Sequence, residues 1–305
     1  MAKSFPEVLL ELATEDSRIC GVSCDCWGFI APLAQKFPER AIELGIAEQN
    51  LIGVSAGLAL RGKIPFAIGM NPFITMRCFE QIRTDVGYGA RNVKVIGGYG
   101  SGLMYGGWGC THHAMEEIGL MRLIPTMIVT MPADAYETEQ ITRAVAKMDS
   151  PAYIALAGGS LPLNIPESER SFEIGKASLL RKGDDVTIFG TGMTVGDALR
   201  AGDMLADKGI SARVFSMHTI KPVDKNAILQ SAKETKLIIT IEEHTVIGGL
   251  GGAVAEVLAD AGAGTPLRRL GLQDVFACMV GSHYDVKNRF GITSEAIVET
   301  VLSMS

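Results

Sequence analysis

Short runs of apolar and β-branched residues alternate along the chain with longer stretches of helical periodicity, and this alternation occurs twice. Such a pattern is typical of βαβ units and of a parallel sheet. It predicts an α/β fold class with two open, mostly parallel α/β sheets. Residues 161–175 hold two prolines and little periodicity, which indicates a boundary. We expect one domain over residues 1–165, a linker over 166–184 and a second domain over 185–305.

The first half begins with an expected helix that Ser4 caps, with Pro6 in its first turn. Expected strands then cover residues 18–23, 41–44, 64–68, 93–98, 126–132 and 152–156. Expected helices cover 47–60, about 79–86, 115–123 and 136–147. In the second half we expect strands over 184–190, 212–217 and 236–243. Helices are expected over 194–207, with Thr194 as the cap, after Pro222, and over 253–262.

Composition and charge exclude several classes of protein. The 305 residues include Lys+Arg 28 and Asp+Glu 34, for a net charge of -6, and no cluster of basic residues. Nucleic acid is therefore not an expected partner. No apolar run approaches the roughly 18 residues of a membrane span, so we expect no membrane association and a cytoplasmic location. Six cysteines in a chain of this length predict reduced thiols rather than a disulfide framework.

Glu48 is the first candidate for chemistry. It lies in the first turn of the expected helix 47–60, which is apolar nearly all round and is therefore expected to be buried. One interpretation is a carboxylate favoured by the helix dipole. The other is a buried acid at the end of a strand, where open α/β sheets place their ligands. Burial would favour its protonated form and allow it to share a proton with a ligand nitrogen.

His112 and His113 close a loop that holds seven glycines between Gly97 and Gly109. Ordering so many glycines is costly, which indicates a close backbone approach to a ligand or to another chain. Imidazoles at the exit of this loop can donate to substrate oxygens or transfer protons. A pair of surface histidines before a helix is the alternative.

Other motifs are weaker. Cys24 and Cys26 have no second pair at metal-like spacing, so we do not expect a zinc site. Cys110 lacks a separate orienting partner and is expected to be inert rather than a nucleophile. The glycines at 190, 192 and 196 miss the dinucleotide-binding spacing and indicate tight packing between strand and helix. His244, within the stretch IEEHT, is expected to be a structural polar group at an interface.

Longer motifs carry a family resemblance. GIAEQNLIGVSAGLALRGKIPF and GCTHHAMEEIGLMRLIPTMIVTMPADAYET resemble the pyrimidine-binding domain of the transketolase family of thiamine diphosphate enzymes. VTIFGTG, IEEHTVIGGLGG and RLGLQD resemble the C-terminal domain of that family. Together these motifs cover nearly the whole chain in the family's order.

The resemblance implies that two different subunits together form the active site. The family's diphosphate-binding domain, with its GDG motif, holds Mg2+ and the cofactor diphosphate, and no GDG occurs in this sequence. The chain therefore resembles the C-terminal subunit of a split transketolase, completed by a separate N-terminal subunit. The resemblance implies an α2β2 assembly with thiamine diphosphate at the subunit interface, where the cofactor is the electron sink for carbon–carbon cleavage. A two-carbon ketol unit would pass from a ketose to an aldose.

Site residues follow from the same resemblance. Glu48 matches the acid that hydrogen-bonds the aminopyrimidine ring nitrogen and favours its imino tautomer. Phe73 matches the aromatic residue that packs on the pyrimidine. Met70 stands where the common pattern has another Phe, and Asp25 matches an Asp near the cofactor. His112 matches the histidine that contacts the substrate.

Three departures from the family pattern affect the expected substrate. Trp108 replaces an Asp that reads a sugar hydroxyl, and Gly158 replaces an Arg that binds the sugar phosphate. The position where the family has a histidine early in the glycine-rich loop falls near Gly100 in this sequence. Loss of the Arg removes a bidentate phosphate partner. We therefore expect an atypical sugar whose anionic group is absent, sulfonated, or bound by the partner chain.

Three alternatives share parts of this pattern. The β subunit of a 2-oxo acid dehydrogenase has the same fold and cofactor, although the THH and MPADAYET stretches fit it less well. An activity like that of 1-deoxyxylulose-phosphate synthase is the second alternative, but that enzyme is normally a single chain and also uses the missing Arg. The third is a paralogue that only binds or regulates, against which the presence of both Glu48 and His112 argues.

Overall fold

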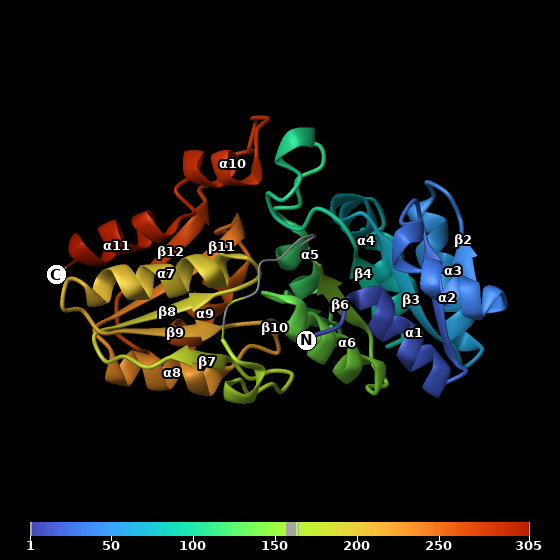
Figure 1. Cartoon of the computed structure of the whole chain (residues 1–305), viewed down its shortest axis with the longest axis horizontal. Helices are drawn as coiled ribbons and strands as arrows, with labels where there is room; N and C mark the ends of the chain where they lie inside the picture. Colours follow the sequence, from blue (N-terminus) through green and yellow to red (C-terminus); the bar gives the residue numbers. More distant parts are fainter. Residues whose placement is uncertain (1, 157–162, 164, 305) are drawn as a thin grey trace.

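The computed structural model describes residues 2–156, 163 and 165–304. Two groups of strands and helices lie side by side, one built from the first half of the chain and one from the second (Figure 1). Each group is an α/β unit around its own sheet, which confirms the predicted fold class. None of the described helices is long and apolar enough to cross a membrane.

The first sheet contains seven strands of the described residues, in the order β10-β5-β6-β4-β3-β1-β2. The strands of the first half are β1 (Ile19–Ser23), β2 (Ala41–Glu43), β3 (Ile64–Gly69), β4 (Lys94–Gly97), β5 (Ile128–Thr130) and β6 (Ala152–Ala155). These six are parallel. One register row runs through Val22, Ala67, Val95, Tyr153 and Val129, all with no exposed surface. Burial of both faces explains why these strands are continuous apolar runs in the sequence.

The edge strand β10 (Thr219–Lys221) comes from the second half of the chain. It pairs antiparallel with β5, with Thr219 opposite Thr130 and Lys221 opposite Val129. The backbone N–H of Met131 also donates to His218 O, at 2.9 Å. A segment of the second half therefore completes the sheet of the first.

Helices cover both faces of the first sheet. On one face are α1 (Phe5–Glu15), α2 (Ala31–Lys36) and α6 (Ala135–Ala146), and on the other α3 (Glu48–Leu60), α4 (Phe79–Gln81) and α5 (Glu117–Leu123). π-helical turns over Phe73–Arg77 and Ile82–Gly87 flank α4. Ser4 is the predicted cap of α1, and it forms a capping box with Glu7.

The second sheet has five strands within the described part of the chain, in the order β12-β11-β8-β9-β7. They are β7 (Ser178–Arg181), β8 (Val186–Gly190), β9 (Ala212–Ser216), β11 (Leu237–Thr245) and β12 (Leu267–Leu272). Only β7 is antiparallel to its neighbour. Apolar residues of α7 (Thr194–Ala206) and α11 (Ser294–Leu302) pack on one face, and those of α8 (Lys225–Glu234) and α9 (Leu250–Asp260) on the other. The remaining helix, α10 (His283–Arg289), lies apart from this sheet, beside the glycine-rich loop (Figure 1).

The two units share buried apolar side chains. Leu103 and Met115, from the first half, belong to a buried cluster formed mainly by the second sheet and its helices. Ile118 and Met121 of α5 belong to the same cluster as Leu250 of α9. The junction is therefore an extension of both cores, which fixes the orientation of one unit relative to the other.

Two local expectations are wrong. Thr194 is the first residue of α7, and Met193 is its cap. The Thr194 hydroxyl donates to the carbonyl oxygens of Thr191 and Ile241, at 2.7 and 2.8 Å, instead of accepting from an N–H group of the helix. Helix α3 is buried on one face only, and its other face is exposed at Gly53, Gly57 and Leu60. An apolar sequence on all sides cannot distinguish burial within the chain from burial against another chain.

Candidate functional site

The candidate site lies at one edge of the first sheet. Parallel strands β1, β3 and β4 end at the same edge, and each is followed by candidate residues: Asp25 after β1, Met70 after β3, and the glycine-rich loop after β4. The carboxyl edge of an open parallel sheet is where ligands bind. Residues far apart in the sequence are therefore brought to one place by strand direction alone.

Glu48 begins α3 directly after β2 and its connecting turn. Its side chain is 4% exposed, and Oε2 accepts a hydrogen bond from Arg77 Nη1 at 2.7 Å. The charge of Glu48 also affects the pKa of two buried thiols. Burial, with a smaller contribution from Glu48, raises the pKa of Cys24 to about 11 and that of Cys78 to about 12. Glu48 is thus nearly enclosed, with a cationic partner at its carboxylate.

Arg77 is the residue that sequence reasoning missed. Besides pairing with Glu48, its guanidinium lies 4.8 Å from the centre of the Phe73 ring. Phe73 and Arg77 are four residues apart, and backbone N–H groups of Phe73 and Ile74 donate to Met70 O at 3.0 and 2.9 Å. An arginine four residues after an aromatic residue in a helical segment is a signal that could have found this contact.

His112 joins the glycine-rich loop to the same cluster. Its ring meets Phe73 edge-to-face, with centroids 5.2 Å apart, and lies 4.9 Å from the Trp108 ring. Thr111 Oγ1 and His112 Nδ1 share a hydrogen bond of 3.0 Å. Trp108 is 63% exposed and therefore borders the site on its open side. Glu48, Arg77, Phe73, His112 and Trp108 form a continuous series of contacts, which we call the site series.

The other predicted residues lie near the site series without joining it. Asp25 is exposed, with φ +52°, and its backbone N–H donates to Glu43 Oε1 at 2.9 Å. Met70 is half-buried one turn before Phe73. His113 is buried, and burial lowers its pKa, so it is not the surface histidine of the alternative interpretation. Gly158 lies outside the described residues.

The loop that carries His112 is held by the second unit. Glu243 is buried and its Oε2 accepts from the Leu103 N–H at 3.1 Å and pairs with His283 Nε2 at 2.8 Å. Gly102 has φ +60°, and a Cβ at this position would lie 2.6 Å from the Cβ of Glu243. The loop backbone therefore approaches Glu243 as closely as only glycine permits.

His244 has the structural role expected from the sequence. It is buried, and its Nε2 accepts a hydrogen bond from the Gly119 N–H of α5 at 3.2 Å. Burial lowers the pKa of His244 to about 4, so it is neutral near pH 7 and able to accept. His244 links β11 to α5 across the junction.

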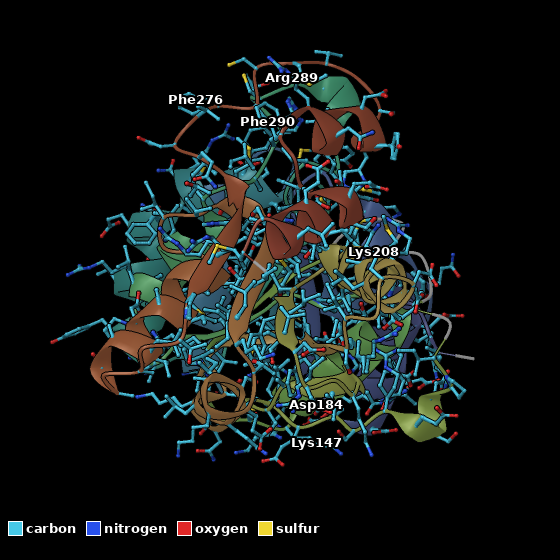
Figure 2. The ribbon with its side chains drawn as sticks, turned by 90° about the vertical axis from the view of Figure 1, so that its left-hand side faces the viewer. Lys147, Asp184, Lys208, Phe276, Arg289 and Phe290 are labelled. Atoms are coloured by element: carbon cyan, nitrogen blue, oxygen red, sulfur yellow. The ribbon has the colours of Figure 1, made fainter. Side chains whose placement is uncertain are left out.

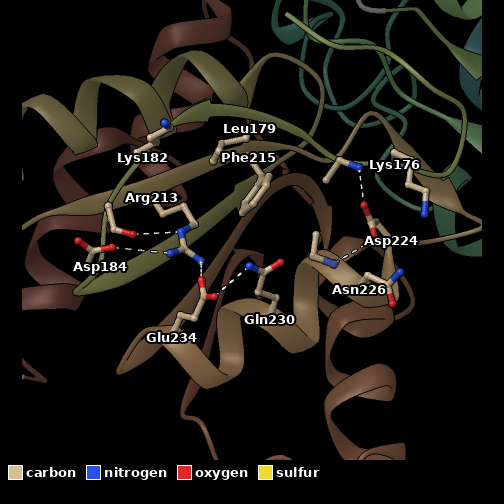
Figure 3. A pocket seen from close by; sticks show the side chains of 13 residues that line it. Lys176, Leu179, Lys182, Asp184, Arg213, Phe215, Asp224, Asn226, Gln230 and Glu234 are labelled. Atoms are coloured by element: carbon tan, nitrogen blue, oxygen red, sulfur yellow. Dashed lines mark hydrogen bonds and ion pairs between the residues drawn. The ribbon is translucent and has the colours of Figure 1, made fainter.

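Hollows also occur away from the site series, the larger of about 1030 Å³ and lined in part by Arg200, His283 and Lys287. Within the described residues no group of three or more His, Cys, Asp or Glu side chains is arranged to hold a metal ion. A hollow of about 510 Å³ opens on the second unit (Figure 3). There Arg213 pairs with Glu234 at 2.7 Å, and Asp224 accepts from the Ala177 N–H at 3.0 Å. These polar groups already bind one another, and the site series lies elsewhere.

Comparisons with known proteins agree with this architecture. The family model for the transketolase pyrimidine-binding domain matches residues 1–162, and that for the transketolase C-terminal domain matches residues 175–297. One of the subunits named for the apulose-4-phosphate transketolase of Phocaeicola vulgatus is 39% identical over 98% of this chain and 96% of its own length. The 6-deoxy-6-sulfo-D-fructose transketolase subunit SqwH of a Clostridium species is 40% identical over 97% of this chain and 91% of its own.

A solved structure has the same fold. It is described as a split-gene transketolase, an inactive beta4 tetramer, and superposes with a TM-score of 0.89 at 38% identity. The match covers 98% of this chain and 96% of that one. The two matched domains, in this order over nearly the whole length, show that the chain belongs to the transketolase family, whose members depend on thiamine diphosphate.

Proposed function

We propose that this chain is the C-terminal subunit of a split transketolase, which transfers a two-carbon ketol unit from a ketose to an aldose. The observation that carries the proposal is the site series at the carboxyl edge of the first sheet. It groups a buried acid, a half-buried aromatic ring and a histidine next to an open side. The relatives named as transketolase subunits, matched over nearly their full length, support the same function.

The residues present suit the pyrimidine half of thiamine diphosphate. Glu48 is enclosed and can bind a ring nitrogen, while Phe73 offers a flat apolar face, with Met70 one turn away. Asp25 at the same edge would lie beside the cofactor. When bound, thiamine diphosphate supplies the electron sink for carbon–carbon cleavage. Glu48 would hydrogen-bond the pyrimidine ring nitrogen, as the family resemblance implies.

Arg77 requires a rearrangement in this proposal. Its guanidinium occupies the Glu48 carboxyl group that would bind the ring nitrogen. Arg77 is 46% exposed, so there is room for its guanidinium to move toward solvent. Formation of the complete site would then include release of Glu48 from Arg77.

His112 and Trp108 would meet the sugar. The Thr111 hydroxyl engages Nδ1 of His112, which leaves Nε2 as the nitrogen for a substrate oxygen. Trp108 offers an apolar surface where an Asp would bind a hydroxyl. We propose an atypical sugar, with an anionic group that is absent, sulfonated or bound by the partner chain. The relatives named for apulose-4-phosphate and for a sulfonated fructose support this proposal.

Subunit assembly completes the proposal. An N-terminal subunit would supply the diphosphate-binding domain and most ligands of Mg2+, and self-association would give α2β2. Exposed apolar residues support both contacts: Ile46 is 73% exposed, Leu60 61% and Trp108 63%. The tetramer described as inactive supports a need for a second kind of subunit. The six free thiols support a cytoplasmic location.

Reconstitution tests this function. The full chain would be assayed with thiamine diphosphate and Mg2+ on a panel of phosphorylated, sulfonated and neutral ketoses, alone and with a candidate N-terminal subunit. We expect ketol transfer only in the mixture, and a fall of at least about a hundredfold for Glu48→Ala, because its interaction acts in the transition state. Glu15→Gln, at the exposed end of α1, is the matched control.

Two outcomes would overturn the proposal. Pyruvate decarboxylation without ketol transfer would favour the 2-oxo acid dehydrogenase alternative. Ketol transfer that persists in Glu48→Ala would remove Glu48 from its role. Trp108→Asp and Gly158→Arg test the substrate separately, since either should shift preference toward ordinary sugar phosphates if the missing side chains set specificity.

A further inference from the structure

Two cysteines meet across the junction between the units. Cys110 lies in the glycine-rich loop, and Cys278 lies in the segment between β12 and α10. Both are exposed, and slight burial together with the neighbouring Cys110 thiol raises the pKa of Cys278. Neither residue belongs to the site series.

The backbones on both sides are held in register. The N–H of Gly281 donates to Gly106 O at 3.1 Å, and a Cβ at Gly109 would lie 3.3 Å from Val280 Cγ2. Ala277, next to Cys278, is fully buried in the core of the second unit. The two thiols are therefore neighbours because their flanking segments pack, and not because two free loops happen to overlap.

The segment that carries Cys278 is tightly turned. Backbone N–H groups of Cys278 and Met279 donate to the carbonyl oxygens of Phe276 and Ala277, at 2.8 and 2.7 Å. Figure 2 shows Phe276 together with Arg289 and Phe290 of the α10 region, at the end of the molecule away from Asp184. Turns of this kind hold the Cys278 side chain outward while Ala277 points into the core.

The other four cysteines are poor competitors for the same chemistry. Cys20, Cys24, Cys26 and Cys78 are buried, and burial raises the pKa of each thiol to about 11 or 12. Because the thiolate is the reacting form, thiol–disulfide exchange at these sites is suppressed at neutral pH. Cys110 and Cys278 differ from these four in being exposed, and are therefore the thiols that a disulfide in solution can reach.

We propose that Cys110 and Cys278 form a reversible intrachain disulfide, which ties the glycine-rich loop to the second unit when a small-molecule disulfide is present. In the first step a cysteine thiolate attacks glutathione disulfide, forming a mixed disulfide and releasing one glutathione. The second cysteine thiolate then attacks the protein sulfur of the mixed disulfide and displaces the second glutathione. Two protein thiols become one disulfide, and two glutathione thiols take up the electrons and protons.

Such a bond would fix the loop just before His112. Segment 106–112 already contacts the second unit through Gly106 and Gly109, and a covalent link at Cys110 would remove the remaining freedom of Trp108. The cross-link joins residues that are far apart in the sequence, so it would also restrict the unfolded chain strongly.

Mass spectrometry of the full chain tests the proposal directly. After incubation with glutathione disulfide under native conditions, we expect an intact mass lower by two hydrogens and a linked peptide pair that contains Cys110 and Cys278. Cys110→Ser and Cys278→Ser should each instead carry one glutathione per chain. Dithiothreitol should restore the starting mass in every case. None of these measurements needs catalysis, so their failure is distinguishable from failure of the proposed function.

Trp108 reports on the restriction of the loop. In a Trp27→Phe background, Trp108 is the remaining tryptophan. Oxidation should lower the collisional quenching of its fluorescence by acrylamide, and the change should be absent in the same background with Cys110→Ser. Wild-type chains that keep two glutathiones, or that link to each other rather than internally, would overturn the disulfide. Unchanged quenching after linkage would overturn the restriction of the loop.

Discussion

Glu117, at the start of α5, carries a carboxyl group that the fold removes completely from water. Ser101, in the glycine-rich loop, donates a hydrogen bond to Glu117 Oε1 at 3.0 Å. Burial raises the pKa of Glu117 to about 8, and the hydrogen bonds that its carboxyl group accepts lower it only in part. The protonated form is therefore the form that the folded chain accommodates at neutral pH.

This pKa shift predicts a specific dependence of stability on pH. Between the ordinary value of 4.5 and about 8 the folded chain holds a proton that the unfolded chain has lost, so stability falls as pH rises through that window. Glu117→Gln should be more stable than wild type at about pH 8 by on the order of a few kcal/mol, and equal to it at about pH 5. Urea unfolding at both pH values measures the difference.

An exposed glutamate gives the matched comparison. Glu299→Gln, on the outer side of α11, should leave stability unchanged at both pH values. A gain in Glu117→Gln that is the same at both pH values would mean that packing, and not charge, explains the effect.

The site residues could be predicted to different degrees. Glu48 and His112 stand in long motifs that resemble those of the family. Phe73 and Trp108 were identified from their positions relative to these motifs, so the sequence was enough to name all four. Their roles stay predictions. Arg77 was missed because its importance depends on a contact with Glu48, and these two residues are brought together only by the fold.

Helix α9 depends on one buried acid from a neighbouring strand. Glu242 in β11 accepts from the N–H groups of Leu250 and Gly251, at 2.6 and 2.7 Å, which would otherwise lack partners in the first turn of the helix. Burial raises the pKa of Glu242 to about 7, although these two N–H groups act in the opposite direction. A side chain outside the helix thus provides its cap.

Removal of this acid should weaken α9 more than removal of an ion pair on its surface. We expect Glu242→Ala to lower the free energy of unfolding by about 2–4 kcal/mol, since two buried donors lose their acceptor. Glu256, which is also in α9, is exposed and pairs with Arg122 of α5. Glu256→Ala should lower the free energy of unfolding by less than about 1 kcal/mol. Denaturant unfolding measures both, and equal losses would contradict the capping role.

Periodicity explains which elements could be predicted. Strands β1, β3 and β8 are fully buried apolar runs and were placed to within one or two residues. Strands β7, β10 and β12 were missed, because they are short or carry exposed charged residues at sheet edges. The turns on either side of α4 depart from regular helical spacing, which sequence periodicity does not distinguish.

Glu243 links the two units of the whole molecule. Burial alone would raise the pKa of this carboxyl, but His283 and Lys287 hold it below its ordinary value. His283 belongs to α10 and Leu103 to the glycine-rich loop, so one carboxylate holds together three segments. An apolar side chain at position 243 would leave the Leu103 N–H and His283 without this acceptor, while Lys287 would keep its ion pair with Asp197.

Loss of the Glu243 carboxylate should therefore change the protection of the glycine-rich loop, which belongs to the other unit. We expect Glu243→Ala to speed hydrogen exchange at the Leu103 amide and to lower the free energy of unfolding by about 3–5 kcal/mol. Asp203→Asn removes an exposed ion pair with Arg181 and is the control, with no expected change at Leu103. Unchanged protection of the Leu103 amide in Glu243→Ala would show that the loop is held by other contacts.

Strand β10 makes the first unit incomplete without the second. If the chain were cut at residue 162, where the match to the pyrimidine-binding domain ends, β5 would become an outer strand with unpaired backbone groups. Uncapped outer strands recruit further strands from other molecules, so the separated fragment would tend to aggregate. The end of the matched pyrimidine-binding domain is thus not a point at which this polypeptide can be divided without exposing a sheet edge.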